Sequence, residues 1–406
     1  MNELTSLGVI LLFALFAGHL VKFARVPEIT GYILAGIAVG PFGMGWLSHD
    51  NLASLSVFSE VALGLILFSL GSVFEAERFK VVGQRVLRVT LAESLLSAAL
   101  VTGGMLLFGQ ALEGSLLLGT IAMETAAAST LMVMRECNAE GPLSDTLTGI
   151  IGINNIFCLI GFSLVAAGID LKMQLATGGD WLATIYGSLY PLVWQLIGSV
   201  ALGFLVGVLL ASWSLKVVEH GEIAILLIGC VLLCVGAALL LELSPLIASL
   251  SVGATLTNLS SDSRRLFHVL SRSDPPFYAI FFVIAGADLN LGLITSIGSL
   301  GLVYLLARFV GKFLGARLAT GREGFAKPVQ RWLGFGLMSH AGLAVGLTML
   351  IHRRFPALGD SVGAIVLAAV VICEMVGPLS ARLAIVRSGE AHAKKLSPDE
   401  ALAELG

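Results

Sequence analysis

The sequence predicts an all-α polytopic membrane protein, and three observations support this fold class. The chain of 406 residues is 57% hydrophobic and 13% charged, whereas soluble domains carry about 25% charged residues. Its mean hydropathy of +0.94 means that the chain has more apolar surface than the core of a water-soluble protein could bury. The apolar residues also fall in runs of about 20, the length that crosses a bilayer as a helix.

The charge balance and the cysteines indicate no nucleic-acid partner, metal cage or cofactor. The net charge is −3, and the charges lie in short clusters between the apolar runs. The cysteines lie mostly within apolar runs without the spacing of zinc ligands, so we interpret them as packing residues. They are Cys137, Cys158, Cys230, Cys234 and Cys373.

The apolar runs predict about thirteen transmembrane helices. The first run begins almost at Met1 without a basic leader or a small-residue cleavage site, so we expect a retained span rather than a signal peptide. Pro245, Pro275 and Pro276 mark the starts of two short spans, because proline is tolerated in a helix's first turn. The approximate limits are 4–22, 29–47, 52–74, 86–109, 113–134, 142–168, 183–214, 221–243, 245–258, 276–289, 291–316, 329–351 and 361–386.

The distribution of lysine and arginine predicts the orientation of these spans. Connections after even-numbered spans contain only Lys172, Arg353 and Arg354, whereas most of the other basic residues follow odd-numbered spans. We therefore expect the N-terminus outside and the C-terminus in the cytoplasm, as in a bacterial inner membrane. The transmembrane region would cover residues 1–387, and the tail 388–406 is too short for a nucleotide-binding domain. Any such regulator would be a separate chain.

Two regions rich in small and hydroxyl-bearing residues predict broken or closely crossed helices. They are 123–130 (METAAAST) in the fifth span and 334–346 (GFGLMSHAGLAVG) in the twelfth. Small residues let backbones approach, and hydroxyl groups can satisfy freed carbonyls. A separation of seven spans fits inverted repeats that form a site between discontinuous helices at the midplane. The alternative is ordinary helix packing.

Three polar residues at bilayer depth are transport-site candidates, because such groups are costly unless they face a cavity or a partner. Asn154 and Asn155 lie in the sixth span, and Glu124 lies near the middle of the fifth, about 16 Å from either end. The asparagine oxygens suit Na⁺ or K⁺, and their NH₂ groups could hold an anion. The alternatives are helix-bridging asparagines and a glutamate that is protonated or in a structural ion pair.

Other residues could complete such a site. Thr125, Ser129 and Thr130 offer hydroxyl ligands, or backbone partners in an unwound segment. Arg308 and Lys312 share a helix face at i, i+4, and Arg308 is the deeper charge, for which Glu124 is the expected partner.

The sequence indicates a role in transport less clearly for His340 and the remaining intramembrane acids. His340 is either a pH switch or a neutral histidine bonded to freed backbone. We interpret Glu60, Glu93, Glu242 and Glu374 as structural, with Glu60 and Glu93 as a possible pair.

Four segments resemble the monovalent cation/proton antiporter superfamily, in particular Kef-like proteins and Na⁺/H⁺ exchangers. They are 25–41 (RVPEITGYILAGIAVGP), 282–289 (FVIAGADL), 308–316 (RFVGKFLGA) and 376–378 (VGP). The resemblance implies a thirteen-helix transporter, not an enzyme. It also implies a core domain with two crossed unwound helices, a scaffold that forms a homodimer, and elevator-like alternating access.

The chain departs from the family pattern at the ion site. The family carries an acidic, Asn-Asp or Gln-Asp pair in the sixth span, whereas Asn155 stands at the position of its last aspartate. An amide does not titrate, so Glu124 is the candidate for a relocated carboxylate. The resemblance implies exchange of Na⁺ or K⁺ for protons. The alternatives are an uncoupled ion pathway or sensor that kept the fold, and a carrier of an anionic or organic solute.

Overall fold

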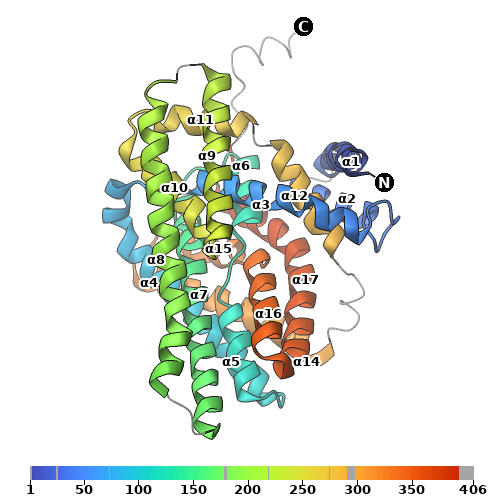
Figure 1. Cartoon of the computed structure of the whole chain (residues 1–406), viewed down its shortest axis with the longest axis vertical. Coiled ribbons are helices and arrows are strands. Elements are labelled where there is room, and N and C mark those ends of the chain that lie inside the picture. Colours follow the sequence, from blue (N-terminus) through green and yellow to red (C-terminus); the bar gives the residue numbers. More distant parts are fainter. Residues whose placement is uncertain are drawn as a thin grey trace.

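The computed structural model describes residues 2–23, 26–72, 74–177, 181–217, 219–273, 275–289 and 298–392, and these residues form helices joined by short connections (Figure 1). The helices are α1 (Glu3–Phe23), α2 (Glu28–Val39), α3 (His49–Gly71), α4 (Ala76–Leu107), α5 (Leu112–Ile121), α6 (Ala127–Glu136), α7 (Pro142–Thr177), α8 (Trp181–Ser214), α9 (His220–Leu240), α10 (Pro245–Leu259), α11 (Ser263–Ser273), α12 (Pro275–Asp288), α14 (Gly298–Arg322), α15 (Lys327–Gly336), α16 (Gly342–Arg354) and α17 (Pro356–Ser388).

These helices confirm the predicted all-α fold class. Within the described segments, eight helices are long and apolar enough to cross a membrane, and several shorter apolar helices accompany them. Each predicted span coincides with one helix or a broken pair, although the first residues of the eleventh span lie outside the described part. The number of membrane crossings stays a prediction.

The predicted breaks are present. The fifth span is divided between α5 and α6, and the twelfth between α15 and α16. The two breaks touch, because the Ala126 N–H donates a hydrogen bond of 3.2 Å to the Ser339 carbonyl. Gly377 lets α17 lie close to the second break, since a Cβ there would lie 2.8 Å from Ser339 Cα. The small residues thus form crossed discontinuous helices rather than ordinary helix packing.

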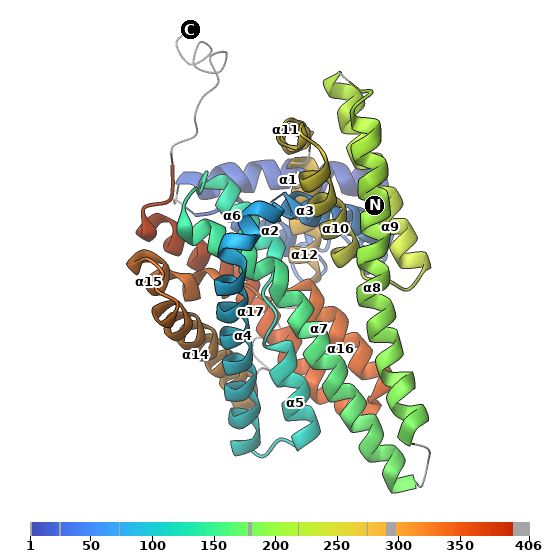
Figure 2. The same ribbon diagram turned by 90° about the vertical axis from the view of Figure 1, so that its left-hand side faces the viewer.

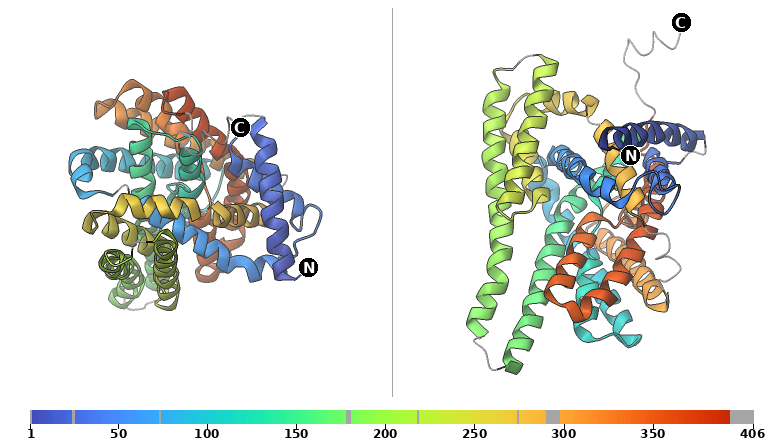
Figure 3. Two further views of the ribbon diagram at one scale, coloured as in Figure 1. Left: turned by 90° about the horizontal axis from the view of Figure 1, so that it is seen from above. Right: turned by 45° about the vertical axis from the view of Figure 1, so that its right-hand side comes forward.

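The helices pack around separate apolar clusters. One joins α3 to α8–α11, a second joins α1, α2 and α12 to α3, and two larger clusters lie among the helices that carry the breaks. Figures 2 and 3 show the long helices α8 and α9 along one side of the molecule and α14 on the opposite side. The crossing lies in the part formed by α4–α7 and α14–α17.

Two glycines hold α14 unusually close to α4. A Cβ on Gly311 would lie 2.5 Å from Ser97 Cα, and a Cβ on Gly315 would lie 2.5 Å from Glu93 Cα. Real Cβ atoms do not approach that closely, so only glycine fits at these positions. Lys312 lies between the two glycines, and the close contact brings its side chain against α4.

Candidate functional site

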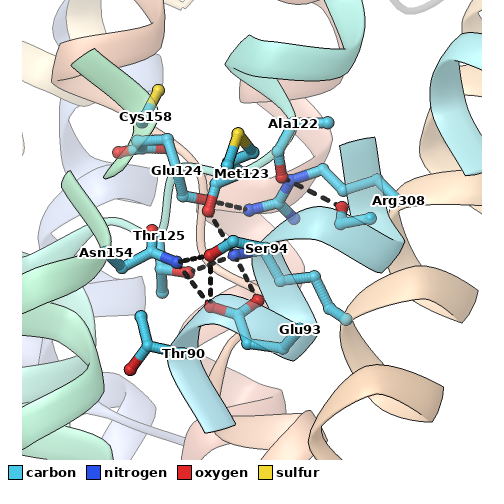
Figure 4. A network of polar contacts seen from close by, with 12 residues as sticks. Thr90, Glu93, Ser94, Ala122, Met123, Glu124, Thr125, Asn154, Cys158 and Arg308 are labelled. Carbon is cyan, nitrogen blue, oxygen red and sulfur yellow. Dashed lines mark hydrogen bonds and ion pairs between the residues drawn. The ribbon is translucent and has the colours of Figure 1, made fainter. Parts of the chain in front are cut away.

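Arg308 joins the two helix breaks. Its fully buried guanidinium donates hydrogen bonds of 2.9 Å to the carbonyls of Met338 and Ser339, and one of 2.8 Å to the carbonyl of Glu124; the last contact is visible in Figure 4. These carbonyls belong to the unwound residues that follow α15 and α5, near the C-terminal ends of the two helices, which carry partial negative charge. The arginine therefore satisfies backbone groups of both breaks with a single cation.

This geometry corrects the expected pairing of Arg308 with the Glu124 carboxylate. The guanidinium lies on the backbone carbonyl of Glu124, while the carboxylate Oε2 lies 2.5 Å from His340 Nδ1. The Ala341 N–H is 3.4 Å from the same oxygen. The sequence predicted the breaks, but it could not show which oxygen of Glu124 faces Arg308, because that depends on how the helices pack.

Glu124, His340 and Tyr304 form a buried chain of polar contacts. On the other side of the imidazole, Nε2 lies 3.0 Å from the Tyr304 hydroxyl, and all three residues are buried. Each ring nitrogen of His340 therefore has a partner, and a proton can lie on either atom of the short Nδ1–Oε2 contact. The partner of His340 Nδ1 is thus the Glu124 carboxylate and not a freed backbone group.

Lys312, one turn beyond Arg308, contacts oxygens of the first break and of α4. Its Nζ donates hydrogen bonds of 2.5 Å to the Met123 carbonyl and 2.8 Å to Thr125 Oγ1, and lies 2.9 Å from Glu93 Oε2. The Lys312 and Glu93 side chains are both fully buried. Lys312 is therefore held inside the protein rather than extended toward the membrane surface.

Glu93 lies at the centre of this second cluster, a position that its sequence context did not predict. Its Oε1 accepts hydrogen bonds of 2.5 Å from Asn154 Nδ2 and 3.0 Å from Ser94 Oγ. Figure 4 shows Glu93, Ser94, Thr125 and Asn154 gathered on one side of the break. The structure replaces the expected pairing with Glu60, because Glu93 is in an ion pair with Lys312 and the Glu60 side chain is exposed. The available signal was Gly311 and Gly315 around Lys312, since small residues mark close helix contacts.

The other candidates occupy different places around the crossing. Thr130 Oγ1 lies 3.4 Å from the Gly336 carbonyl and 3.4 Å from Ser339 Oγ, which fits the role of backbone partner. Ser129 Oγ and Asn155 Oδ1 are buried and have no hydrogen-bond partner among the described residues. Asn154, but not Asn155, contacts the Glu93 cluster, consistent with neighbouring helical side chains that point about 100° apart.

Comparison with known proteins identifies the family. Residues 8–385 match the family model described as "Sodium/hydrogen exchanger, transmembrane". The chain belongs to the sodium/hydrogen exchanger family. It is therefore a multi-pass membrane protein of the cation/proton antiporter type and not an enzyme, which confirms the resemblance found in the sequence motifs.

Individual relatives cover nearly the whole exchanger chain. The ammonium/H⁺ antiporter subunit AmhT of Alkalihalophilus pseudofirmus is 24% identical over 363 residues, which span 89% of this chain and 87% of AmhT. A structure of the sodium/proton antiporter MjNhaP1 from Methanocaldococcus jannaschii at pH 8 has a TM-score of 0.69 and 18% identity, covering 95% of this chain and 98% of that one. An electron-microscopy structure of MjNhaP1 has a TM-score of 0.71 and 17% identity, covering 95% and 94%. These structures support the fold.

Proposed function

We propose that this protein exchanges a monovalent cation for protons by elevator-like alternating access around the crossed breaks. The observation that carries the proposal is the buried Glu124 carboxylate on the first break, 2.5 Å from His340 on the second. An antiporter needs a group that holds a proton in one half of its cycle and releases it in the other. A carboxylate in contact with an imidazole can do so, whereas the amide of Asn155 cannot.

The oxygens around the crossing supply ligands for a cation. Thr125, Ser129, Asn154 and Asn155 contribute hydroxyl and amide oxygens, and the buried oxygens of the last three include atoms without a hydrogen bond among the described residues. Oxygen ligands of this kind bind hard monovalent cations. The assignment does not depend on an aspartate at position 155.

An anionic solute is a weaker candidate. The guanidinium that would bind it already donates to three carbonyls of the breaks through Nη1 and Nη2. An anion that binds Nη1 and Nη2 would have to displace these bonds and leave buried carbonyls unsatisfied, at roughly 1–3 kcal/mol each. We therefore favour a cation.

The proposed assembly is a homodimer in a bacterial plasma membrane, with the N-terminus outside and the C-terminus in the cytoplasm. Residues 1–387 would contain a core with the crossed breaks and a scaffold that dimerises, followed by the short tail 388–406. Lysine and arginine in the connections after odd-numbered spans support this orientation.

Flux measurements in proteoliposomes test this function. Purified protein would be reconstituted with a pH-sensitive dye inside, and Na⁺, K⁺, Li⁺ or NH₄⁺ would be added against a proton gradient. Ammonium belongs in the series because the relative AmhT carries that name, and protein-free vesicles give the baseline for ammonia diffusion. Absence of cation-dependent proton movement would favour a sensor, and movement without coupling would favour an ion pathway.

Glu124→Gln provides the residue-level test. The amide keeps the volume and hydrogen bonding of the side chain but cannot titrate, so we expect proton-linked flux to fall at least about 100-fold, the scale of lost proton transfer. Glu60→Gln is the matched control, since Glu60 is an exposed acid in an apolar helix. Flux at the wild-type rate in Glu124→Gln would exclude Glu124 from coupling.

A further inference from the structure

The Lys312 ammonium occupies a position enclosed by oxygen atoms. A lysine ammonium has three N–H donors and no acceptor. Here the Met123 carbonyl, Thr125 Oγ1 and Glu93 Oε2 lie 2.5, 2.8 and 2.9 Å from Nζ. A backbone carbonyl, a hydroxyl and a carboxylate are also the oxygen types that bind a free monovalent cation.

One buried oxygen beside this ion pair lacks a hydrogen bond. Glu93 Oε2 is paired with Lys312 at 2.9 Å. Asn154 is fully buried, and its Nδ2 holds Glu93 while its Oδ1 has no hydrogen-bond partner among the described residues. A buried acceptor without a partner is unfavourable, and a bound ion is one explanation that fits an oxygen-lined position.

The charge of the cluster allows an exchange of cations. Glu93 and Lys312 together are neutral, so replacing the lysine headgroup by a free monovalent cation leaves the buried charge unchanged. Lysine is a point charge on a flexible stem and can withdraw. Arg308 is held by bonds to both breaks and cannot withdraw without exposing three carbonyls.

We propose that the oxygens around Lys312 are the cation site of this protein, that Glu93 supplies its negative charge, and that the Lys312 ammonium is a tethered competitor for the transported ion. This inference deepens the proposed function, on which it rests for the movement of the ion. It relocates the ion-binding carboxylate from the helix that carries Asn155 to α4.

The site favours cations with the size and charge of ammonium. The oxygen distances of 2.5 to 2.9 Å suit N–H donors, and NH₄⁺ would use the same three oxygens. Potassium is close to ammonium in radius and carries no protons. Sodium and lithium are smaller and require the oxygens to move inward.

The first experiment removes the tethered competitor. Lys312→Ala, purified in detergent, is heated with equal concentrations of NH₄⁺, K⁺, Na⁺, Li⁺ or choline as chlorides. We expect a saturable rise in Tm of a few degrees with ammonium, a similar or smaller rise with potassium, and none above the choline baseline with lithium. Glu93→Gln combined with Lys312→Ala keeps the cavity without the carboxylate and should lose the ammonium-specific rise. Equal shifts for ammonium, lithium and choline in Lys312→Ala would overturn the proposal.

The second experiment does not need Lys312→Ala to fold. Glu93→Gln combined with Lys312→Gln removes both charges and leaves no unpaired buried ion, so its folding is retained more readily than that of either single variant. In proteoliposomes we expect its cation-driven proton flux to fall at least tenfold relative to wild type, whereas Glu60→Gln keeps its flux. Wild-type flux and cation selectivity in the double variant would overturn the proposal.

The two experiments separate this inference from the proposed function. If the wild type moves no cation, the antiport proposal fails, while an ammonium-specific stabilisation of Lys312→Ala still supports the site. If the wild type exchanges cations and the Glu93–Lys312 double variant does so equally well, the antiport proposal stands and this site is wrong.

Discussion

At the scale of single residues, Arg308 is the main stabilising cation of the crossing. A buried charge usually needs an opposite charge or several hydrogen bonds, because its desolvation is costly. Arg308 finds three carbonyls at the negative ends of two helix segments, which together replace a carboxylate. Its structural role is therefore tied to the helix breaks and not to the titration of Glu124.

The first residue-scale prediction follows from these bonds. Arg308→Gln should lower the free energy of unfolding by at least about 3 kcal/mol, because shorter amide donors leave carbonyls of both breaks unsatisfied. Arg308→Lys should recover only part of the loss, since one ammonium cannot match the planar fork of donors. Thermal or denaturant unfolding in detergent measures both losses.

A double variant checks whether Arg308 acts through the Glu124 carboxylate. Because the guanidinium contacts the backbone of Glu124, Glu124→Gln should not restore the stability lost in Arg308→Gln, so the double variant should be no more stable than Arg308→Gln alone. Full recovery in the double variant would show a direct charge pair instead.

The sequence identified part of the site at this scale. Glu124, Arg308 and His340 stood out because charged or polar groups are rare at bilayer depth. The sequence did not predict which of the buried polar residues contact one another, because the contacting residues are far apart in the chain. Glu93 and Asn154 are 61 residues apart, and Glu124 and His340 are 216 apart. Pairing depends on helix contacts, and only the glycines on either side of Lys312 gave a signal for one of them.

At the scale of helices, the sequence was most informative where apolar length and small residues were decisive. Runs of small residues located both breaks, because close backbone approach requires them. The amphipathic helix α11 was missed, since its apolar residues alternate with exposed arginines and form no apolar run. Leu266, Val269 and Leu270 of α11 are buried, whereas Arg264 and Arg265 are exposed.

The start of α7 shows an interaction that no local pattern predicts. The Glu390 carboxylate accepts hydrogen bonds of 2.7 and 2.8 Å from the backbone N–H groups of Leu143 and Ser144, and one of 2.8 Å from Ser144 Oγ. A carboxylate at a helix N-terminus satisfies free N–H groups and complements the helix dipole. Gly141 leaves room for it, because a Cβ there would lie 2.5 Å from Glu390 Cδ. The chain beyond α17 thus stabilises the helix that carries Asn154.

The helix-scale prediction concerns this cap. Glu390→Gln removes the negative charge and one acceptor, so we expect a loss of about 1 kcal/mol in stability. Amide hydrogen exchange at Leu143 and Ser144 should become faster. Glu140→Gln is the control on the same connection, because the Glu140 side chain is exposed. Unchanged exchange at α7 in Glu390→Gln would mean that the cap contributes nothing measurable.

At the scale of the whole molecule, contacts between connections divide into two sets. Connections after odd-numbered spans contact one another, as in the pairs Glu28–Glu136 and Cys137–His392. Connections after even-numbered spans do the same, and their pairs are Lys172–Glu113, Arg354–Asp170 and Gln110–Ser361. This division fits segments that cross a membrane alternately, and most lysines and arginines fall in the first set. The chain pattern predicted the two sides, but it could not show which connections touch.

The whole-molecule prediction uses Cys137 to test which side faces the cytoplasm. Cys137 lies between α6 and α7 and is partly exposed, whereas the other four cysteines are buried. A membrane-impermeant maleimide should label the protein in inside-out vesicles and not in right-side-out vesicles, and Cys137→Ser should abolish the signal.

Burial raises the pKa of the Cys137 thiol. Because the thiolate is the nucleophile, labelling should accelerate about tenfold per pH unit below that pKa. Labelling of right-side-out vesicles would reverse the orientation predicted from the basic residues. The C-terminal segment would then also lie outside, because the His392 N–H donates a hydrogen bond of 3.0 Å to the Cys137 carbonyl.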